Sequence, residues 1–249
     1  MIPYWPPPDF HIGRWHIPSF NLMLLIAVSL WVLIAMRRAR REGIDPAIQW
    51  RMCFWAVVGT LIFAHLAKVM MESWPEFVAD PTVVFRKPGI RSLGGLIGGL
   101  LAVAAYARFR KLSFEQGFHM LENITFALPL PWIFGRLGCF LVHDHPGAFS
   151  NHWLAVQFPE GPRFDLGLLE MLFLIPFSAW FFWLDRNPRP LGFFFGLYTL
   201  VYGAFRLCLD SLALEPYRYY GWVLIASLGI ITLLWSRRSG SLPAKSAPA

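Results

Sequence analysis

Residues 118–147 read FHMLENITFALPLPWIFGRLGCFLVHDHPG, and this stretch decides the fold. Up to Val142 it is largely apolar and long enough to cross the hydrocarbon core of a bilayer as a helix. Arg136 lies inside the apolar run, where a charged side chain is costly and usually serves function or a buried ion pair. His143, Asp144 and His145 follow the run directly. The stretch therefore predicts a transmembrane helix with a titratable cluster at the membrane surface.

The composition extends this prediction to the whole chain. Its 249 residues are 56% hydrophobic and 15% charged, with a mean hydropathy of +0.48, which a soluble globule of this length could not bury. The net charge of +7 could suggest nucleic acid, but the basic residues lie in short loops beside apolar runs. The three cysteines show no spacing typical of a disulfide framework or a zinc site. We expect the bilayer as a partner, no nucleic acid, no cofactor and no metal.

Apolar runs predict an all-α, polytopic membrane protein with about seven transmembrane helices. The expected spans are 18–36, 52–72, 93–108, 118–142, 165–185, 190–212 and 219–236. Residues 73–92 are expected to form a polar loop, and a loop of about twenty residues is expected before the fifth span. We predict one membrane-embedded domain over residues 1–236 and a disordered cytoplasmic tail over residues 237–249.

The distribution of basic residues predicts the orientation. Of the 22 Lys and Arg residues, thirteen follow the first, third, fifth and seventh spans, six lie on the opposite face and three lie within spans. Cytoplasmic loops carry the excess of Lys and Arg in membrane proteins. The N-terminus is therefore expected outside and the C-terminus in the cytoplasm.

With this orientation, several polar residues fall at one depth below the outer face. Arg136, Arg206 and His65 lie six or seven residues inside three different spans, or roughly 9–11 Å at the rise of an α-helix. Lys68 shares a helical face with His65, and Glu170 approaches the same level from the fifth span. Such a layer, with more positive than negative groups, favours a site for an anionic ligand.

Two interpretations of this layer remain open. In the structural one, Arg206 pairs with Asp210 four residues later, Arg136 pairs with Glu170, and these ion pairs only stabilise the bundle. In the functional one, the arginines bind an anionic lipid. A common depth on one side of the membrane favours function, because helix packing alone does not require it.

A double-glycine segment opens the third span and also permits two roles. Gly94, Gly95 and Gly98 lie near the N-terminal end of that helix, where unpaired N–H groups and the helix dipole attract a phosphate. The same glycines form overlapping GxxxG pairs, which are typical of close helix packing. The two roles are compatible.

The cluster at 143–145 supplies candidates for a general base. Histidine titrates near neutral pH, and Asp144 could raise the basicity of either neighbour. The alternative is a polar loop before a turn at Pro146 and Gly147. His143, His145 and His65 all remain candidates for the base.

Four ordered motifs resemble those of the bacterial prolipoprotein diacylglyceryl transferase family. Gly135-Arg136-Leu137-Gly138-Cys139-Phe140 is similar to its G-R-x-G-N-F signature. The others are Phe77-Val78-Ala79-Asp80-Pro81, Gly94-Gly95-Leu96-Ile97-Gly98 and Tyr202-Gly203-Ala204-Phe205-Arg206.

The resemblance implies transfer of the diacylglyceryl group of phosphatidylglycerol to the lipobox cysteine of preprolipoproteins, with release of glycerol phosphate. Arg136 and Arg206 would hold the lipid phosphate, and Asp210 would replace a family glutamate. The implied site also includes Glu170 and Lys68 at positions similar to family motifs. It implies a multi-pass protein of the bacterial cytoplasmic (inner) membrane, with its site toward the outer leaflet.

Departures from the family pattern keep an alternative open. Leu93 stands where the family has a histidine, Cys139 replaces an asparagine, and Phe20 replaces a tyrosine. Either the base is displaced to the cluster at 143–145, or the chain is an inactive relative that binds phospholipid or serves as a structural subunit. A small transporter is disfavoured, since no internal repeat is evident and the site lies away from the midplane.

Overall fold

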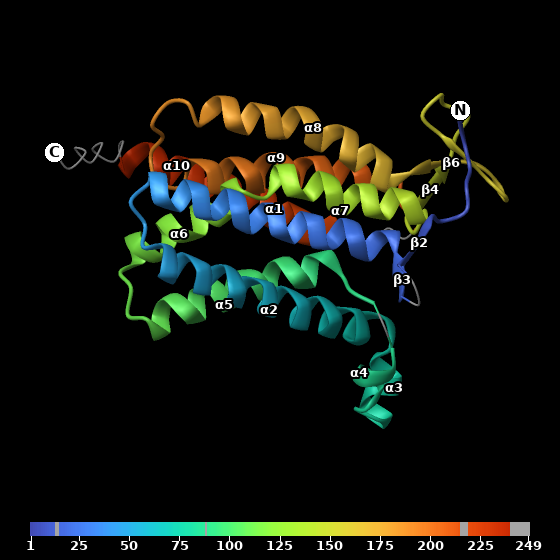
Figure 1. Cartoon of the computed structure of the whole chain (residues 1–249), viewed down its shortest axis with the longest axis horizontal. Helices are drawn as coiled ribbons and strands as arrows, with labels where there is room; N and C mark the ends of the chain where they lie inside the picture. Colours follow the sequence, from blue (N-terminus) through green and yellow to red (C-terminus); the bar gives the residue numbers. More distant parts are fainter. Residues whose placement is uncertain (13–14, 88, 215–218, 240–249) are drawn as a thin grey trace. The chain divides into compact units, whose positions relative to one another are not determined.

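The computed structural model describes residues 1–12, 15–87, 89–214 and 219–239 (Figure 1). The fold is dominated by helices, which confirms the all-α polytopic prediction. The helices are α1 (Ser19–Arg41), α2 (Pro46–Glu72), α3 (Trp74–Ala79), α4 (Val83–Arg86), α5 (Ser92–Phe109), α6 (Phe114–Phe126), α7 (Pro129–Val142), α8 (Leu166–Leu184), α9 (Phe193–Asp210) and α10 (Tyr219–Ser239).

Membrane-crossing helices are identified among the described residues by length and apolar composition. Five helices satisfy both criteria, namely α1, α2, α5, α8 and α9, and α6 with α7 adds a sixth if the bent pair is one span. The seventh expected span coincides with α10, which is not among these candidates in the described part of the chain. The count of seven and the orientation stay predictions.

The chain divides into two compact units. Unit 1 comprises Met1–Ala35 and Ile124–Ala249, and unit 2 comprises Met36–Asn123. The single domain expected over residues 1–236 stays a prediction. Helix α10 continues to Ser239, three residues past the expected end of the last span, and the rest of the expected tail lies outside the described residues.

In unit 2, α2 packs along α5, and the double-glycine segment lies in their contact. A Cβ atom added at Gly94 would lie 2.7 Å from the carbonyl oxygen of Phe63, and one at Gly98 would lie 2.6 Å from Cγ of the same residue. Gly98 also faces the backbone of Gly59. The glycines therefore let two helix backbones approach closely, as the packing interpretation predicts.

The polar loop expected at residues 73–92 contains two short helices, α3 and α4. Pro75 lies in the first turn of α3, where its missing N–H costs nothing, and Pro81 follows Asp80 directly after the helix. The polar composition indicates only a loop, because helices of four to six residues leave almost no periodic pattern.

The expected fourth span, 118–142, is broken into α6 and α7, whose axes bend by 47°. Pro129 opens α7 and Pro131 lies in its first turn. Proline cannot donate the helical N–H bond, and its ring clashes with the preceding turn, so a continuous helix through this point is disfavoured. The apolar run indicates a span but not its interruption.

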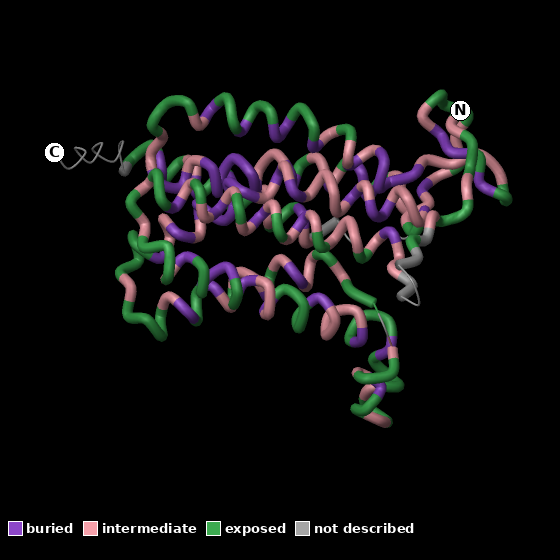
Figure 2. The backbone as a smooth tube through the Cα atoms, in the orientation of Figure 1, coloured by how far each residue is buried: buried purple, intermediate pink, exposed green. Residues whose placement is uncertain are grey.

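In unit 1, α7 packs on α8, and α9 packs on α10. The N-terminal part of α1 also contacts α7, since a Cβ at Gly138 would lie 3.0 Å from Cβ of Met23. Buried residues are frequent along α8 and α9 (Figure 2), and Leu174, Phe181 and Phe194 are almost fully enclosed. These contacts form the apolar core in which the site residues are held.

A small sheet covers one end of α7 and α8 within unit 1. Its strands are β1 (Ile2–Pro3), β5 (Val156–Phe158), β6 (Gly161–Asp165) and β4 (Pro146–Phe149), in that spatial order. A separate hairpin joins β2 (Asp9–Ile12) to β3 (Trp15–Pro18). About half of the expected loop before the fifth span is thus strand, and one of its partners, β1, lies far away in the sequence.

Candidate functional site

The centre of unit 1 is the carboxylate of Glu170, which is completely buried on α8. Its Oε1 accepts hydrogen bonds from Trp132 Nε1 at 3.0 Å and from the hydroxyl of Tyr202 at 2.6 Å. The same oxygen lies 2.8 Å from Nε of Arg136, and Arg206 Nη1 donates to Oε2. One carboxylate of α8 therefore holds side chains of α7 and α9.

Arg206 is held from a second side by Asp210, one helical turn later on α9. Its Nη2 donates to Asp210 Oδ1 at 2.6 Å, and Trp222 Nε1 of α10 donates to Oδ2 at 2.7 Å. The expected pairs of Arg136 with Glu170 and of Arg206 with Asp210 are therefore both present. An additional pair between Arg206 and Glu170 links them into one network.

Some hydrogen-bond donors of this network have no hydrogen-bond partner among the described residues. Arg206 Nε is buried and has no hydrogen-bond partner among the described residues. Arg136 Nη1 donates to the thiol sulfur of Cys139, at 3.6 Å, and the Nε of Arg136 faces Glu170 without hydrogen-bond geometry. Sulfur is a weak acceptor, and a buried N–H without an acceptor is unfavourable. An oxyanion among these groups would satisfy donors that the protein leaves unsatisfied.

The charges of the network in unit 1 balance one another. The sequence predicts an excess of positive groups in the layer, but Glu170 and Asp210 balance the formal charges of Arg136 and Arg206. Isolated charges are too costly to bury, so each arginine is paired within the core. Any affinity for an anion must come from the unsatisfied donors rather than from net charge.

The two other basic residues of the expected layer, His65 and Lys68, belong to unit 2. Both ring nitrogens of His65 face backbone carbonyl oxygens, Nδ1 with Gly89 at 2.9 Å and Nε2 with Val84 at 2.7 Å. A histidine that donates from both nitrogens has no lone pair to accept a proton. Lys68 forms an ion pair with Glu72 at 2.8 Å. This geometry disfavours His65 as a base, and substrate binding by Lys68 stays a prediction.

His143 ends α7 in the left-handed conformation, with φ 51° and ψ 38°. Its Nδ1 lies 2.8 Å from Oδ2 of Asp165, and its ring contacts the aromatic rings of Tyr4, Trp5 and Phe158. The side chain is 2% exposed. His143 is therefore enclosed, which disfavours it as a base for an external substrate.

The left-handed turn folds the chain back over the last turn of α7. The N–H of His143 bonds to the carbonyl of Phe140, and that of Asp144 bonds to the carbonyl of Cys139. This is the Schellman arrangement, normally made with glycine. It returns Asp144 and His145 to Cys139, so that ligand atoms of the three side chains lie within 4.8 Å of one another.

His145 is more accessible than His143, with 37% of its side chain exposed, and its Nδ1 contacts Oδ1 of Asp144. Partial burial lowers the pKa of His145, but hydrogen bonds with Asp144 and Cys139 outweigh it and raise the pKa to about 9. Of the three histidines proposed as a base, only His145 combines exposure with an orienting carboxylate.

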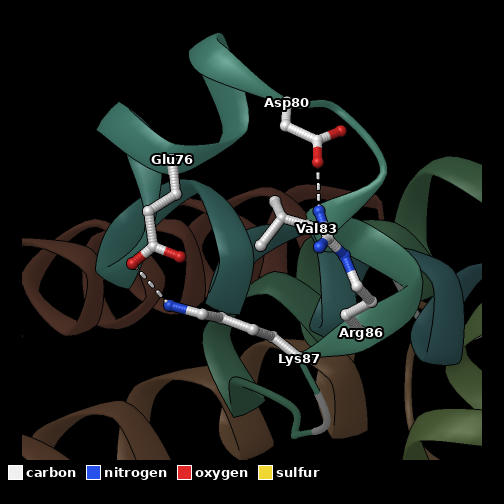
Figure 3. A pocket seen from close by; sticks show the side chains of 5 residues that line it. All are labelled: Glu76, Asp80, Val83, Arg86 and Lys87. Atoms are coloured by element: carbon white, nitrogen blue, oxygen red, sulfur yellow. Dashed lines mark hydrogen bonds and ion pairs between the residues drawn. The ribbon is translucent and has the colours of Figure 1, made fainter.

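Gly94, Gly95 and Gly98 contact α2, so a role for them in substrate binding stays a prediction beside their packing role. A separate pocket of about 320 Å³ opens between α3 and α4 in unit 2 (Figure 3). Its charged residues pair across it, Lys87 with Glu76 at 2.7 Å and Arg86 with Asp80. Because these charges are already matched, the pocket contributes no evident site for a charged ligand.

Four residues of the site were not predicted: Trp132, Tyr202, Trp222 and Asp165. Trp132 precedes Arg136 by four residues, and Tyr202 precedes Arg206 by four, so helical spacing could have placed both beside the arginines. No comparable signal indicated Trp222 or Asp165, whose partners lie on other elements.

The fold and the site together define a polytopic α-helical membrane protein with a buried arginine–carboxylate network beside a Cys–Asp–His cluster. The sequence model of the prolipoprotein diacylglyceryl transferase family matches residues 7–237, and the chain belongs to this family. It is therefore a multi-pass bacterial membrane protein.

Relatives cover nearly the whole chain. It is 29% identical to the phosphatidylglycerol–prolipoprotein diacylglyceryl transferase of Pseudomonas paraeruginosa, over 98% of both chains. The protein of the same name from Chromohalobacter salexigens is 26% identical over 93% of this chain and 92% of its own. That of Symbiobacterium thermophilum is 25% identical over 96% and 95%.

Proposed function

We propose that this protein transfers the diacylglyceryl group from phosphatidylglycerol to the lipobox cysteine of preprolipoproteins. The names of its full-length relatives support this reaction. The structural observation that carries the proposal is the network in which Arg136 and Arg206 share Glu170 and retain unsatisfied donors. Guanidinium groups suit a phosphodiester, because they stay charged when buried and donate in a planar fork.

In the proposed reaction, the thiolate sulfur of the peptide forms a bond to the glyceryl carbon that carries the phosphate. The bond from that carbon to the phosphate oxygen breaks, and its electron pair leaves with glycerol phosphate. Arg136 and Arg206 stabilise the charge of the leaving phosphate, with Arg206 Nε as the first free donor. Glu170 and Asp210 hold both side chains in place.

The thiol must lose its proton before attack, since an unperturbed thiol has a pKa of about 8.5 and is largely protonated at neutral pH. Leu93 stands where the family resemblance places a histidine. We assign this step to Asp144 and His145, because His143 is enclosed and His65 donates from both nitrogens. The pKa of His145 is raised to about 9, so its neutral, proton-accepting form becomes populated as the pH rises toward that value. The site then lies at the outer leaflet of the cytoplasmic (inner) membrane, in agreement with the distribution of basic residues.

The test uses the purified full-length protein with phosphatidylglycerol and a lipobox peptide. We expect the peptide to gain the mass of a diacylglyceryl group, with an equal amount of glycerol phosphate released over many turnovers. Arg136→Ala and Arg206→Ala should each reduce the rate at least about a hundredfold. Arg186→Ala is the matched control, because this exposed arginine lies outside the network.

Absence of transfer by the wild-type protein, with phosphatidylglycerol still bound, would contradict the proposal and favour the lipid-binding relative. Near-normal rates for both arginine variants would contradict the phosphate site while leaving the reaction itself in place.

A further inference from the structure

The C-terminal end of α7 brings together three different metal-ligand side chains. Cys139 is buried in the last turn of the helix, while Asp144 and His145 follow the left-handed turn at His143. Their ligand atoms lie within 4.8 Å of one another. A tetrahedral zinc site with sulfur, nitrogen and oxygen ligands requires separations of about 3.5 Å, calculated from the usual metal–ligand distances. The ligand atoms therefore lie near the separations that such a site needs.

The backbone fixes this arrangement independently of any ion. The N–H of Asp144 bonds to the carbonyl of Cys139, which holds the turn over the helix end. The N–H of Leu166 donates to the carbonyl of His145 at 3.0 Å, which ties the cluster to the start of α8. A site whose backbone is already ordered loses little conformational freedom when a ligand binds.

The contacts of Cys139 and His145 fix the positions of both side chains. Arg136 Nη1 donates to Cys139 Sγ at 3.6 Å, which holds the sulfur beside the turn. Asp144 Oδ1 contacts Nδ1 of His145, so Oδ2 of Asp144 and Nε2 of His145 are the atoms left for an ion. Exposure of 37% for His145 and 39% for Asp144 gives an ion access from solvent.

The surrounding charges do not oppose a cation. The nearby Arg136 and Arg206 are balanced by Glu170 and Asp210, and a thiolate with a carboxylate would balance a divalent ion. Thiolate and imidazole ligands select zinc-like ions over magnesium or calcium, which prefer oxygen.

We propose that Cys139, Asp144 and His145 form a binding site for one divalent ion of the zinc class, with a coordination position open to the substrate thiol. Metal binding by the three residues is independent of the proposed function, and only the coordination of the substrate thiol rests on that function. Three protein ligands leave one tetrahedral position open. A thiol that coordinates there is deprotonated, and its proton passes to solvent, so Asp144 and His145 act in this step as ligands of the ion and not as a free base. The ion thereby promotes the deprotonation of the substrate thiol, for which Leu93 has no basic group.

The probe is Co²⁺, added to the chelator-treated full-length protein in detergent and followed by absorption spectroscopy. We expect one equivalent to bind with the sulfur-to-cobalt charge-transfer band that marks thiolate ligation. Cys139→Ser should abolish the band, whereas Cys208→Ser, at an exposed cysteine on α9, should retain it. His145→Ala and Asp144→Ala should weaken Co²⁺ binding by more than about tenfold.

A lipobox peptide should strengthen the charge-transfer band as a second thiolate binds, and the same peptide with serine in place of cysteine should not. The metal site is wrong if no band forms, or if the band survives Cys139→Ser. Transfer by protein without a cobalt band would overturn this inference and leave the proposed function intact. Cobalt binding at Cys139 without any transfer would support the metal site and contradict the proposed function. If the charge-transfer band does not change when the peptide is added, only the coordination of the substrate thiol is contradicted.

Discussion

His143 Nδ1 lies 2.8 Å from Asp165 Oδ2, and this contact joins the end of α7 to the start of α8. The other carboxylate oxygen of Asp165 accepts the N–H of Leu168 at 3.1 Å as the N-cap of α8. Asp165→Ala removes both bonds and leaves His143 buried without its partner. We expect a loss of about 2–4 kcal/mol in unfolding free energy, measured by thermal unfolding in detergent. Glu160→Ala, at an exposed site nearby, should change it by less than about 0.5 kcal/mol.

Asp165→Asn should separate the charge of this carboxyl from its hydrogen bonds. Burial raises the pKa of Asp165 above its ordinary value of 3.8, although hydrogen bonds from His143 and Leu168 oppose the change. Its contribution to stability is therefore fully present below pH 3.8 and is lost as the pH rises through the raised pKa. Asparagine does not titrate. The Tm of Asp165→Asn minus that of the wild type should therefore increase from acid to neutral pH. A constant difference would contradict the raised pKa.

Arg136→Lys and Arg206→Lys test whether the phosphate site needs guanidinium geometry. Lysine keeps the charge opposite Glu170 but lacks the planar fork and the Nε donor. We expect transfer to fall by at least about tenfold in each variant, with a smaller loss of stability than the alanine variants suffer. Rates with lipobox peptide and thermal unfolding measure the two effects. Arg186→Lys is the control, and unchanged rates for both site variants would argue against direct phosphate contact.

Glu170→Ala is expected to be the most damaging single change in unit 1. It leaves Arg136 and Arg206 without their shared carboxylate and removes the acceptor of the Tyr202 hydroxyl and one of the two acceptors of Trp132. Loss of one partner from a buried ion pair costs about 3–5 kcal/mol. Glu170→Gln keeps the shape and one acceptor oxygen, so it should be less destabilising than Glu170→Ala. Equal stability of Glu170→Ala and the wild type, by thermal unfolding, would contradict the central role of this residue.

Gly98→Ala tests the contact between α2 and α5. The added methyl group would meet the backbone of Gly59 and the side chain of Phe63 on α2. We expect a loss of about 1–3 kcal/mol from overpacking, seen as a lower Tm in detergent. Gly135→Ala is a matched control in α7, since nothing lies within 4 Å of a Cβ added there. Similar losses in both variants would indicate that helix packing at Gly98 is not the cause.

Much of the site was predictable because its information is local. Arg206 and Asp210 are one helical turn apart, and Arg136 and Glu170 fall at similar depths in their spans. Pairing followed from the cost of burying an isolated charge. The depth of the residues did not predict that both arginines share Glu170. This sharing depends on how α7, α8 and α9 are rotated about their axes.

The Cys139 cluster was missed for a different reason. Its ligands are brought together by a left-handed residue, and the usual sequence signal for that conformation is glycine. Here the position is held by His143, whose ring is fixed by Asp165 from another element. The break before α7 was signalled by Pro129 and Pro131, whereas the pairing of β1 with β5 was not, since strands of two or three residues carry no periodicity.

The division of the chain also constrains the order in which the protein is assembled during translation. Unit 2 is continuous in sequence, from Met36 to Asn123, so all its contacts can form once that segment has left the ribosome. Unit 1 cannot be completed then, because β1 pairs with β5, which is synthesised only after α7. The residues of β1 thus precede unit 2 in the sequence but find their partner only after it. If translation stalled before residue 156, unit 2 could be folded, but β1 would have no β5 with which to pair.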